Sequence, residues 1–245
     1  MKELKEKLEY LLKSSGENAA IVDRIQNQES FVPFTAVNRL MAYLLSVGKL
    51  SYQDYEKLNN EFRERNKYIN LFEMAPRTFG QTWGEQHIEE LFPQFIKATK
   101  RNLATDYPDF DGEFDLWHEG IRIEVKACRA NRTDGKRSLA NRAYTHAEAL
   151  ANKFKYHYQQ LKPSCCDVFI WIGVCRDELL YWVLTSKELQ STGKLGSQHR
   201  NENTGVEDAE VFEGQVFMTE EELRPFLVKE NEIFEKVREK GLLQK

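Results

Sequence analysis

The sequence predicts an α/β protein in which helices flank a mixed β-sheet, preceded by a helical N-terminal region. Three observations lead to this prediction. The first seventy-odd residues carry apolar side chains at helical spacing, the middle contains strand-length apolar runs, and helical and strand patterns then alternate. At 245 residues the chain can bury a full core. We expect a helical region over 1–75 and a second domain over 76–245, divided at Met74-Ala75-Pro76.

Helices are predicted throughout the N-terminal region. Leucines at positions 4, 8, 11 and 12 form one helical stripe. A second apolar run over 37–47 ends at Gly48. Ser51 is expected to cap the next helix, with Asp54 in the capping-box position.

The middle of the chain is expected to alternate between helix and strand. Residues 78–91 show helical spacing, and 94–100 follow as a strand after Pro93. A hairpin lies within 107–127, and a basic loop occupies 129–140. Residues 143–161 are rich in Ala, Tyr and Lys and are expected to form one long helix.

The last third begins with two expected strands. The continuous apolar run 168–174 is typical of a buried strand. Residues 179–184 are its expected partner, after a turn at Arg176-Asp177. The tail from Glu220 is charged and expected to be helical.

Charge is distributed unevenly along the chain. The formal net charge is −4, but residues 126–155 hold eight Lys and Arg against two acidic residues, a local charge of +6. Such asymmetry suits a polyanion-binding face on an acidic molecule. The four cysteines contain no CxxC pair, so we expect reduced structural thiols rather than a zinc site. With no signal peptide or membrane-length apolar run, a cytoplasmic location and no membrane partner are expected.

The hairpin carries the chemically informative residues. Alternation on the second strand puts Ile123 and Val125 on one face and Glu124 and Lys126 on the other. A two-residue turn at Glu119-Gly120 pairs residues whose numbers sum to 239. Asp115 then lies opposite Glu124.

Two opposed carboxylates repel each other, so the pair is most easily explained by a shared cation. Carboxylate oxygens suit Mg²⁺, and a neighbouring lysine suits a phosphate oxygen or an attacking water. The tripeptide Glu-x-Lys alone carries little weight, since Glu3-Leu4-Lys5 has the same form. The competing interpretation is a solvent-facing Glu/Lys ladder without catalytic function.

With these residues the chain resembles the PD-(D/E)XK nuclease superfamily, and type II restriction endonucleases in particular. The resemblance covers about 78–185 in the order helix, hairpin with Asp and Glu-x-Lys, helix, buried strand. It implies a restriction-endonuclease-like fold. It also implies catalytic roles for Asp115, Glu124 and Lys126, and a Mg²⁺ ion bound by Asp115, Glu124 and the Val125 carbonyl.

The resemblance leaves the aspartate open. Members often add an acidic residue from the preceding helix, and Glu85 matches that place as a further catalytic residue. The family's Pro-Asp pair does not stand directly before Asp115. Pro108-Asp109 lies upstream and Asp111 shares the strand face of Asp115, so three aspartates remain candidates for the metal ligand.

The expected function is a Mg²⁺-dependent, type II restriction-like endonuclease that cleaves double-stranded DNA as a homodimer. A repair or recombination nuclease on the same fold and a non-catalytic DNA-binding module are the alternatives. The helical region over 1–75 is expected to supply DNA contacts or the dimer interface. After the site strand, basic residues are placed to contact DNA phosphates or bases. These residues are Arg129, Arg132, Lys136, Arg137, Arg142, Lys153 and Lys155.

Overall fold

The computed structural model describes residues 10–12, 14, 16, 36–133, 138–197 and 212–244. The chain forms two compact units, Met1–Lys67 and Tyr68–Lys245. Residues 68–75, expected in the N-terminal region, therefore fold with the second unit. The Tyr68 backbone N–H donates to the Arg176 carbonyl at 2.9 Å, and Leu71 and Phe72 enter the core beside the sheet.

The first unit contains two described helices, α3 (Ala36–Ser46) and α4 (Tyr52–Glu64). Gly48 takes a positive φ of 68° after α3, and the Ser51 side chain accepts from the Asp54 N–H at the start of α4. The end of α3 and the start of α4 were therefore predicted correctly. The leucine stripe over residues 4–12 lies largely outside the described residues.

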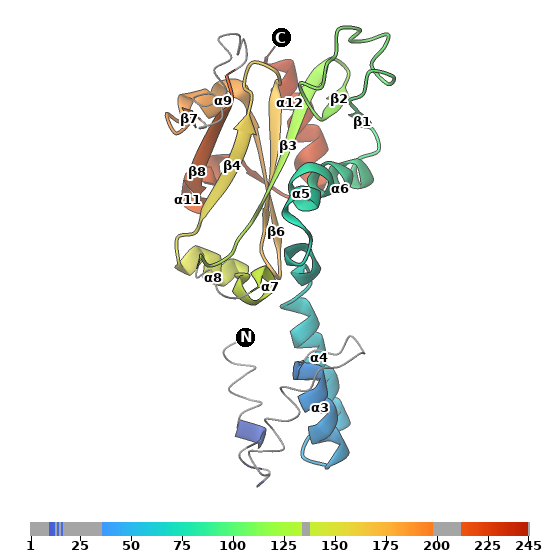
Figure 1. Ribbon diagram of the computed structural model, residues 1–245, viewed down its shortest axis with the longest axis vertical. Coiled ribbons are helices and arrows are strands. Elements are labelled where there is room, and N and C mark those ends of the chain that lie inside the picture. The colour runs from blue at the N-terminus through green and yellow to red at the C-terminus, as the bar shows by residue number, and fades with distance from the viewer. Residues whose placement is uncertain are drawn as a thin grey trace. The chain divides into compact units, whose positions relative to one another are not determined.

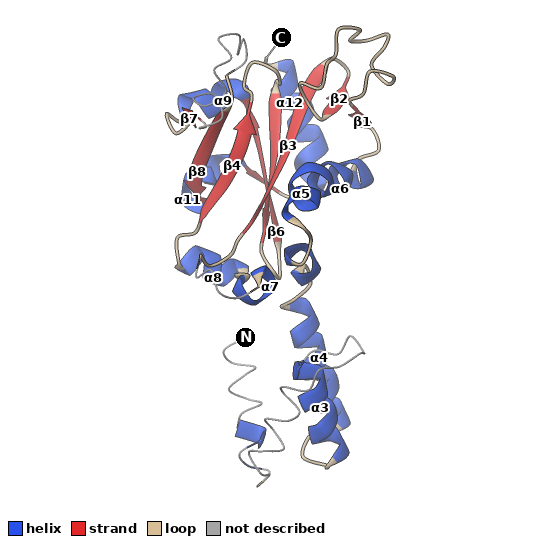
Figure 2. Ribbon diagram, in the orientation of Figure 1, coloured by secondary structure: helices blue, strands red, loops and turns tan. Residues whose placement is uncertain are grey.

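The second unit contains two β-sheets (Figures 1 and 2). The larger is mixed, with strand order β1-β2-β3-β5-β6-β9, and the smaller has the order β4-β8-β7. The strands are β1 (Ile96–Lys97), β2 (Leu116–His118), β3 (Ile121–Arg129), β4 (Lys155–Leu161), β5 (Val168–Val174), β6 (Leu179–Thr185), β7 (Gly196–Ser197), β8 (Gly214–Thr219) and β9 (Leu227–Val228).

Short helices surround the sheets in the second unit. None of the helices in the described parts of the chain is long and apolar enough to cross a membrane. The helices of the second unit are the 3-10 helix η1 (Ile69–Phe72), α5 (Pro76–Thr78), the π-helix η2 (Phe79–Trp83), α6 (Gly84–Leu91), α7 (Leu139–Arg142), α8 (His146–Ala151), α9 (Ser186–Ser191), α11 (Glu220–Leu223), the 3-10 helices η3 (Arg224–Phe226) and η4 (Glu230–Glu232), and α12 (Ile233–Leu242).

The larger sheet separates two apolar cores. On one face, Ile123, Val125 and Ile170 pack against residues of η2, α6 and α12. On the other face, Trp171 and Trp182 pack against the smaller sheet. Figure 1 shows α6 and α12 on one side of β3 and β6, and β4 and β8 on the other. The arrangement confirms a mixed α/β architecture.

One predicted element is wrong. Residues 143–161 are not one helix, because α8 ends at Ala151 and the chain turns at Lys153, whose φ is 48°. It then continues as β4, in which Tyr156 and Tyr158 alternate inward. The tail from Glu220 is largely helical, as predicted, but it also contains the short strand β9, which pairs with β6.

The other predicted elements are largely confirmed. Residues 78–91 are helical but include the π-helical segment η2, and the strand expected over 94–100 is only Ile96–Lys97. The strands expected over 168–174 and 179–184 are β5 and β6, which pair antiparallel. All four cysteines are free thiols, and Cys165, Cys166 and Cys175 are buried.

His146 links three elements of the second unit. Its Nδ1 lies 2.8 Å from Glu178 Oε2 and its Nε2 lies 2.9 Å from Glu220 Oε2. Burial lowers the pKa of this imidazole, but hydrogen bonds and charge from the two carboxylates outweigh burial and raise it. The imidazolium therefore holds α8 to the turn after β5 and to α11.

We expect His146→Gln to lower the free energy of unfolding by about 1 kcal/mol at low pH. The folded-state pKa lies above 6.5, so the stabilisation is complete below pH 6.5 and disappears as the pH rises through the folded-state pKa. Urea unfolding at about pH 5.5 and about pH 9 measures this difference. An equal loss of stability at both pH values would contradict the proposed charge state.

Candidate active site

The hairpin has the predicted register. Leu116 pairs with Ile123 and His118 with Ile121 around the turn at Glu119-Gly120. Both turn residues take positive φ, 45° and 85°, which such a two-residue turn requires. The register places the predicted residues of β3 at a defined position beside β2.

Strand alternation on β3 is also confirmed. Ile123 and Val125 point into the core that α6 covers. Glu124 and Lys126 point to the opposite face of the sheet, where Lys126 Nζ contacts Glu124 Oε1. Glu124 is only 6% exposed, so this face is not the solvent-facing ladder of the competing interpretation.

Burial dominates the electrostatics of the Glu124–Lys126 pair. Burial and, after it, the charge of Asp115 raise the pKa of Glu124 to about 7, against the lowering effects of Lys126 and Lys162. Burial disfavours the charged form of Lys126, but the carboxylates of Glu124 and Asp115 outweigh burial and raise its pKa. The lysine is therefore held as an ammonium ion between acidic groups.

Asp115 lies where the β2–β3 ladder ends. Leu116 and Ile123 are the last residues of the two strands that pair. Beyond them, the side chain of Asp115 accepts a hydrogen bond from a backbone N–H of β3. Its Oδ2 accepts from the Val125 N–H at 2.8 Å. Burial raises the pKa of Asp115, against the lowering effects of Lys126 and of that hydrogen bond.

The backbone of β3 directs the Val125 carbonyl towards Asp115. On the β5 side, the Asp167 N–H donates to the Arg122 carbonyl at 2.8 Å. On the β2 side, the Asp115 N–H donates to the Ile123 carbonyl at 3.0 Å. Because the N–H and C=O of one strand residue point to the same edge, the Val125 carbonyl faces the edge at which Asp115 accepts the Val125 N–H.

Glu85 approaches the same edge from α6. This helix packs on β3 at the buried Gly84, which lies against the side chains of Val125 and Ala127. Lys97 of β1 lies 3.3 Å from Glu85 Oε2. Burial raises the pKa of Glu85, and the charge of Asp115 raises it further.

The structure separates the three candidate aspartates. Asp111 is 80% exposed and forms a 2.8 Å ion pair with Lys100. Asp109 is also exposed. Asp115 alone of the three bonds to β3 and influences the pKa of Glu124.

Asp115 and Glu124 are the two carboxylates proposed as metal ligands. Among the described residues, no three His, Cys, Asp or Glu side chains are grouped so that they could hold a metal ion. A Mg²⁺ site does not need a group of three such side chains, because Mg²⁺ is usually bound by one or two carboxylates, with water and substrate phosphate as its other ligands. Asp115, Glu124 and the Val125 carbonyl fit this pattern.

A pocket opens beside Lys126. It has a volume of about 170 Å³ and lies between β3, η2 and β4. Its lining includes Lys126, which pairs with Glu124, and three polar residues of β4. The lining residues are Gly80, Lys126, Ala127, His157, Tyr158, Gln159 and Gln160.

The predicted DNA-contact arginines near the end of β3 bind backbone carbonyls. Arg129 donates to the carbonyls of Leu71 and Met74 at 3.1 and 3.0 Å. Arg132 donates to the Asn141 carbonyl and Arg142 to the Arg132 carbonyl, each at 2.8 Å. Arg129 therefore holds the end of β3 to residues 71–74, and Arg132 and Arg142 stabilise the segment after β3.

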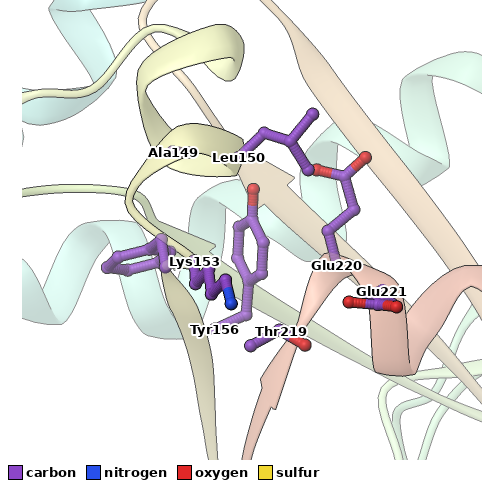
Figure 3. A pocket seen from close by; sticks show the side chains of 8 residues that line it. Ala149, Leu150, Lys153, Tyr156, Thr219, Glu220 and Glu221 are labelled. Atoms are coloured by element: carbon purple, nitrogen blue, oxygen red, sulfur yellow. The ribbon is translucent and has the colours of Figure 1, made fainter.

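The predicted lysines have different surroundings. Lys136 and Arg137 lie outside the described residues. Lys155 is exposed on β4, whereas Lys153 borders a second pocket of about 130 Å³ between α8, β4 and α11 (Figure 3). Glu220 and Glu221 also line this second pocket, so it is a mixed-charge site distinct from the pocket at Lys126.

Sequence reasoning missed Lys97 and Lys162. The charges of both lysines lower the pKa of Asp115, and that of Lys162 also lowers the pKa of Glu124. Lys162 directly follows residues 143–161, which were expected to form one long helix. Recognition of the Tyr156/Tyr158 alternation as a strand pattern would have placed it at a strand end, beside the site.

Comparison with known proteins gives no match. No protein-family model, no curated protein and no solved structure matches the chain. The side-chain and backbone geometry around Glu124 is therefore the basis for a functional proposal.

Proposed function

We propose that the protein is a Mg²⁺-dependent endonuclease of the type II restriction kind that hydrolyses phosphodiester bonds of double-stranded DNA. The observation that carries this proposal is the buried Glu124–Lys126 pair beside Asp115 at the end of the hairpin ladder. The mixed sheet and the order of its elements support a PD-(D/E)XK fold.

The residues of the site divide into two roles. Asp115, Glu124 and the Val125 carbonyl would hold the Mg²⁺ ion. When bound, the ion supplies positive charge to a phosphate oxygen and lowers the pKa of a coordinated water. Lys126 sits beside the same carboxylates and directs its ammonium group towards a non-bridging phosphate oxygen or the attacking water.

The remaining acidic and basic residues position these groups. Glu85 adds a carboxylate near Asp115, and Lys97 holds Glu85 in place. Hydrolysis adds water across the P–O3′ bond, so the oxygen of water joins phosphorus and the departing 3′ oxygen gains a proton. The products are a 5′-phosphate and a 3′-hydroxyl.

A homodimer is part of this proposal, because a two-fold symmetric protein matches a two-fold symmetric DNA site. Sedimentation equilibrium of the full chain, with and without duplex DNA, measures the oligomeric state. A monomer under both conditions would contradict the dimer and would leave the proposed chemistry unaffected.

The direct test incubates purified protein with supercoiled plasmid and Mg²⁺, beside a reaction with EDTA. Discrete linear fragments in Mg²⁺ alone are expected. A smear or cleavage only at branched or single-stranded sites would support a repair nuclease instead. Intact DNA across several divalent ions and substrates would refute the catalytic proposal.

Metal binding has a readout that does not depend on cleavage. At Mg²⁺ concentrations about 100-fold above Kd, binding should stabilise the folded protein by about 2.7 kcal/mol. Differential scanning fluorimetry should then show a rise in Tm of roughly 5–10 °C. Asp115→Asn and Glu124→Gln should abolish the rise, because each removes one of the proposed ligands.

Glu119→Gln is the matched control for the thermal shift. It removes the same charge from the exposed turn of the same hairpin. Its Tm should rise with Mg²⁺ as in the wild type. If all variants respond equally, Mg²⁺ acts elsewhere on the protein.

A further inference from the structure

The smaller sheet has a polar outer face with one exposed aromatic ring. Tyr156 and Tyr158 of β4 and Val216 of β8 point into the core. By alternation, His157 and Phe217 point away from it. Phe217 remains 49% exposed, an unusual position for a large apolar side chain on a strand.

His157 and Phe217 form a flat stacked pair. Their ring centroids lie 3.8 Å apart and their planes are tilted by 15°. His157 Nε2 donates to Gln215 Oε1 at 2.9 Å, and Gln215 Nε2 donates to the Ser197 carbonyl at 3.2 Å. Side chains and backbone from β4, β8 and β7 thus hold the imidazole in one orientation against Phe217.

One face of Phe217 is left without an aromatic neighbour. His157 covers the other face, and no second ring of the described residues stacks on Phe217. The platform formed by Phe217 and His157 therefore offers a rigid aromatic surface at low entropic cost.

The platform is continuous with the pocket at Lys126. His157 and Lys126 both line that pocket. The His157 N–H donates to Cys128 Sγ at 3.3 Å, so this edge of β4 lies directly against β3. In Figure 1, β4 lies between β8 and β3, the strand that carries Lys126.

We propose that the Phe217–His157 platform stacks an unpaired nucleobase of the DNA bound at Lys126. This proposal rests on the proposed nuclease function and deepens it: the double-stranded substrate would place one base, flipped or frayed out of the helix, on the platform beside the cut. A base inside a duplex has both faces covered by its neighbours, whereas a single-stranded, frayed or flipped base has a free π-face.

Charge near the platform suits the phosphates that accompany such a base. Lys155 is exposed two residues before His157 on the same face of β4. Lys126 lies at the other side of the shared pocket. Stacking from Phe217 and attraction from these ammonium groups together resemble the combination that single-stranded nucleic acids require.

The test measures binding in EDTA, where Mg²⁺-dependent cleavage is absent. Fluorescence anisotropy compares a single-stranded oligonucleotide, a duplex with an overhang and a blunt duplex of the same sequence. Phe217→Ala should weaken binding to the first two by about 5- to 100-fold and leave the blunt duplex unchanged, since one base–aromatic stack is lost.

Two further variants separate stacking from general apolar contact. Phe217→Trp should retain binding to unpaired DNA, whereas Phe217→Leu should lose it as Phe217→Ala does. Oligonucleotides with 2-aminopurine at the unpaired position report the stack directly. Their fluorescence should be quenched by the wild type but not by Phe217→Ala.

Several outcomes would overturn the platform. They are full binding by Phe217→Leu, equal losses on all three DNAs, and no loss in Phe217→Ala. If such a result accompanies Mg²⁺-dependent cleavage, the platform is wrong and the nuclease proposal stands. If Phe217 supports binding to unpaired bases but no cleavage occurs with Mg²⁺, the platform stands and the nuclease proposal fails.

Discussion

Glu124→Gln is expected to reduce Mg²⁺-dependent DNA cleavage by at least about 10³-fold. The substitution keeps the shape of the side chain but removes the charge that would bind Mg²⁺ and that pairs with Lys126. Loss of metal-assisted charge stabilisation costs several kcal/mol in the transition state, and each 1.36 kcal/mol is tenfold in rate. Single-turnover cleavage of plasmid DNA measures the change.

Lys126→Ala should lower the single-turnover rate by about 10²- to 10³-fold, the scale for removal of one electrostatic group from a transition state. Binding of duplex DNA in EDTA should change far less than the rate. Glu119→Gln is the control for charge removal on this hairpin and should cleave like the wild type. Equal cleavage by Glu124→Gln and the wild type would show that another site or a contaminant cuts the DNA.

The second large effect is expected on stability, from Gly173→Ala near the end of β5. A Cβ at this position would lie 2.6 Å from Trp182 Cη2 and 2.8 Å from Tyr156 Cε1. Both rings are buried and packed between the two sheets. The added methyl group must displace them, so we expect a loss of about 2–3 kcal/mol in the free energy of unfolding.

Gly80→Ala is the matched control for this substitution. A Cβ at Gly80 meets nothing within 4 Å, and the residue lies in a helical segment. Its stability should be unchanged or higher by up to about 1 kcal/mol, because alanine restricts the unfolded chain more than glycine does. Urea unfolding of both variants checks the difference. Equal stability of the two variants would mean that the rings move aside at little cost.

Local patterns were sufficient for the central hairpin and its neighbours. The turn at Glu119-Gly120 and the two apolar rows together determine one register, and the structure has that register. Alternation then places Glu124 and Lys126 on one face whatever surrounds them. The continuous apolar character of 168–174 likewise predicted β5, because both faces of that strand are buried.

Local patterns failed where distant segments decide the conformation. Residues 155–161 follow an alanine-rich helix and have no strong local break before them. They become β4 because β8, more than fifty residues later, supplies the antiparallel partner for Lys155 through Tyr158. Pairing with a distant strand also explains β9 in the C-terminal tail, where Leu227 and Val228 form an edge strand because they pair with β6.

The candidate site shows the same division. The sequence by itself determined that Glu124 and Lys126 share one face, because side chains two residues apart on a strand point to the same side of the sheet. It favoured Asp115 but left Asp111 and Asp109 as alternatives. Only the tertiary structure separated them, because the ladder ends at Leu116 and frees the Val125 N–H for the Asp115 carboxylate. Where strand pairing stops depends on the packing of the surrounding elements, which no local spacing records.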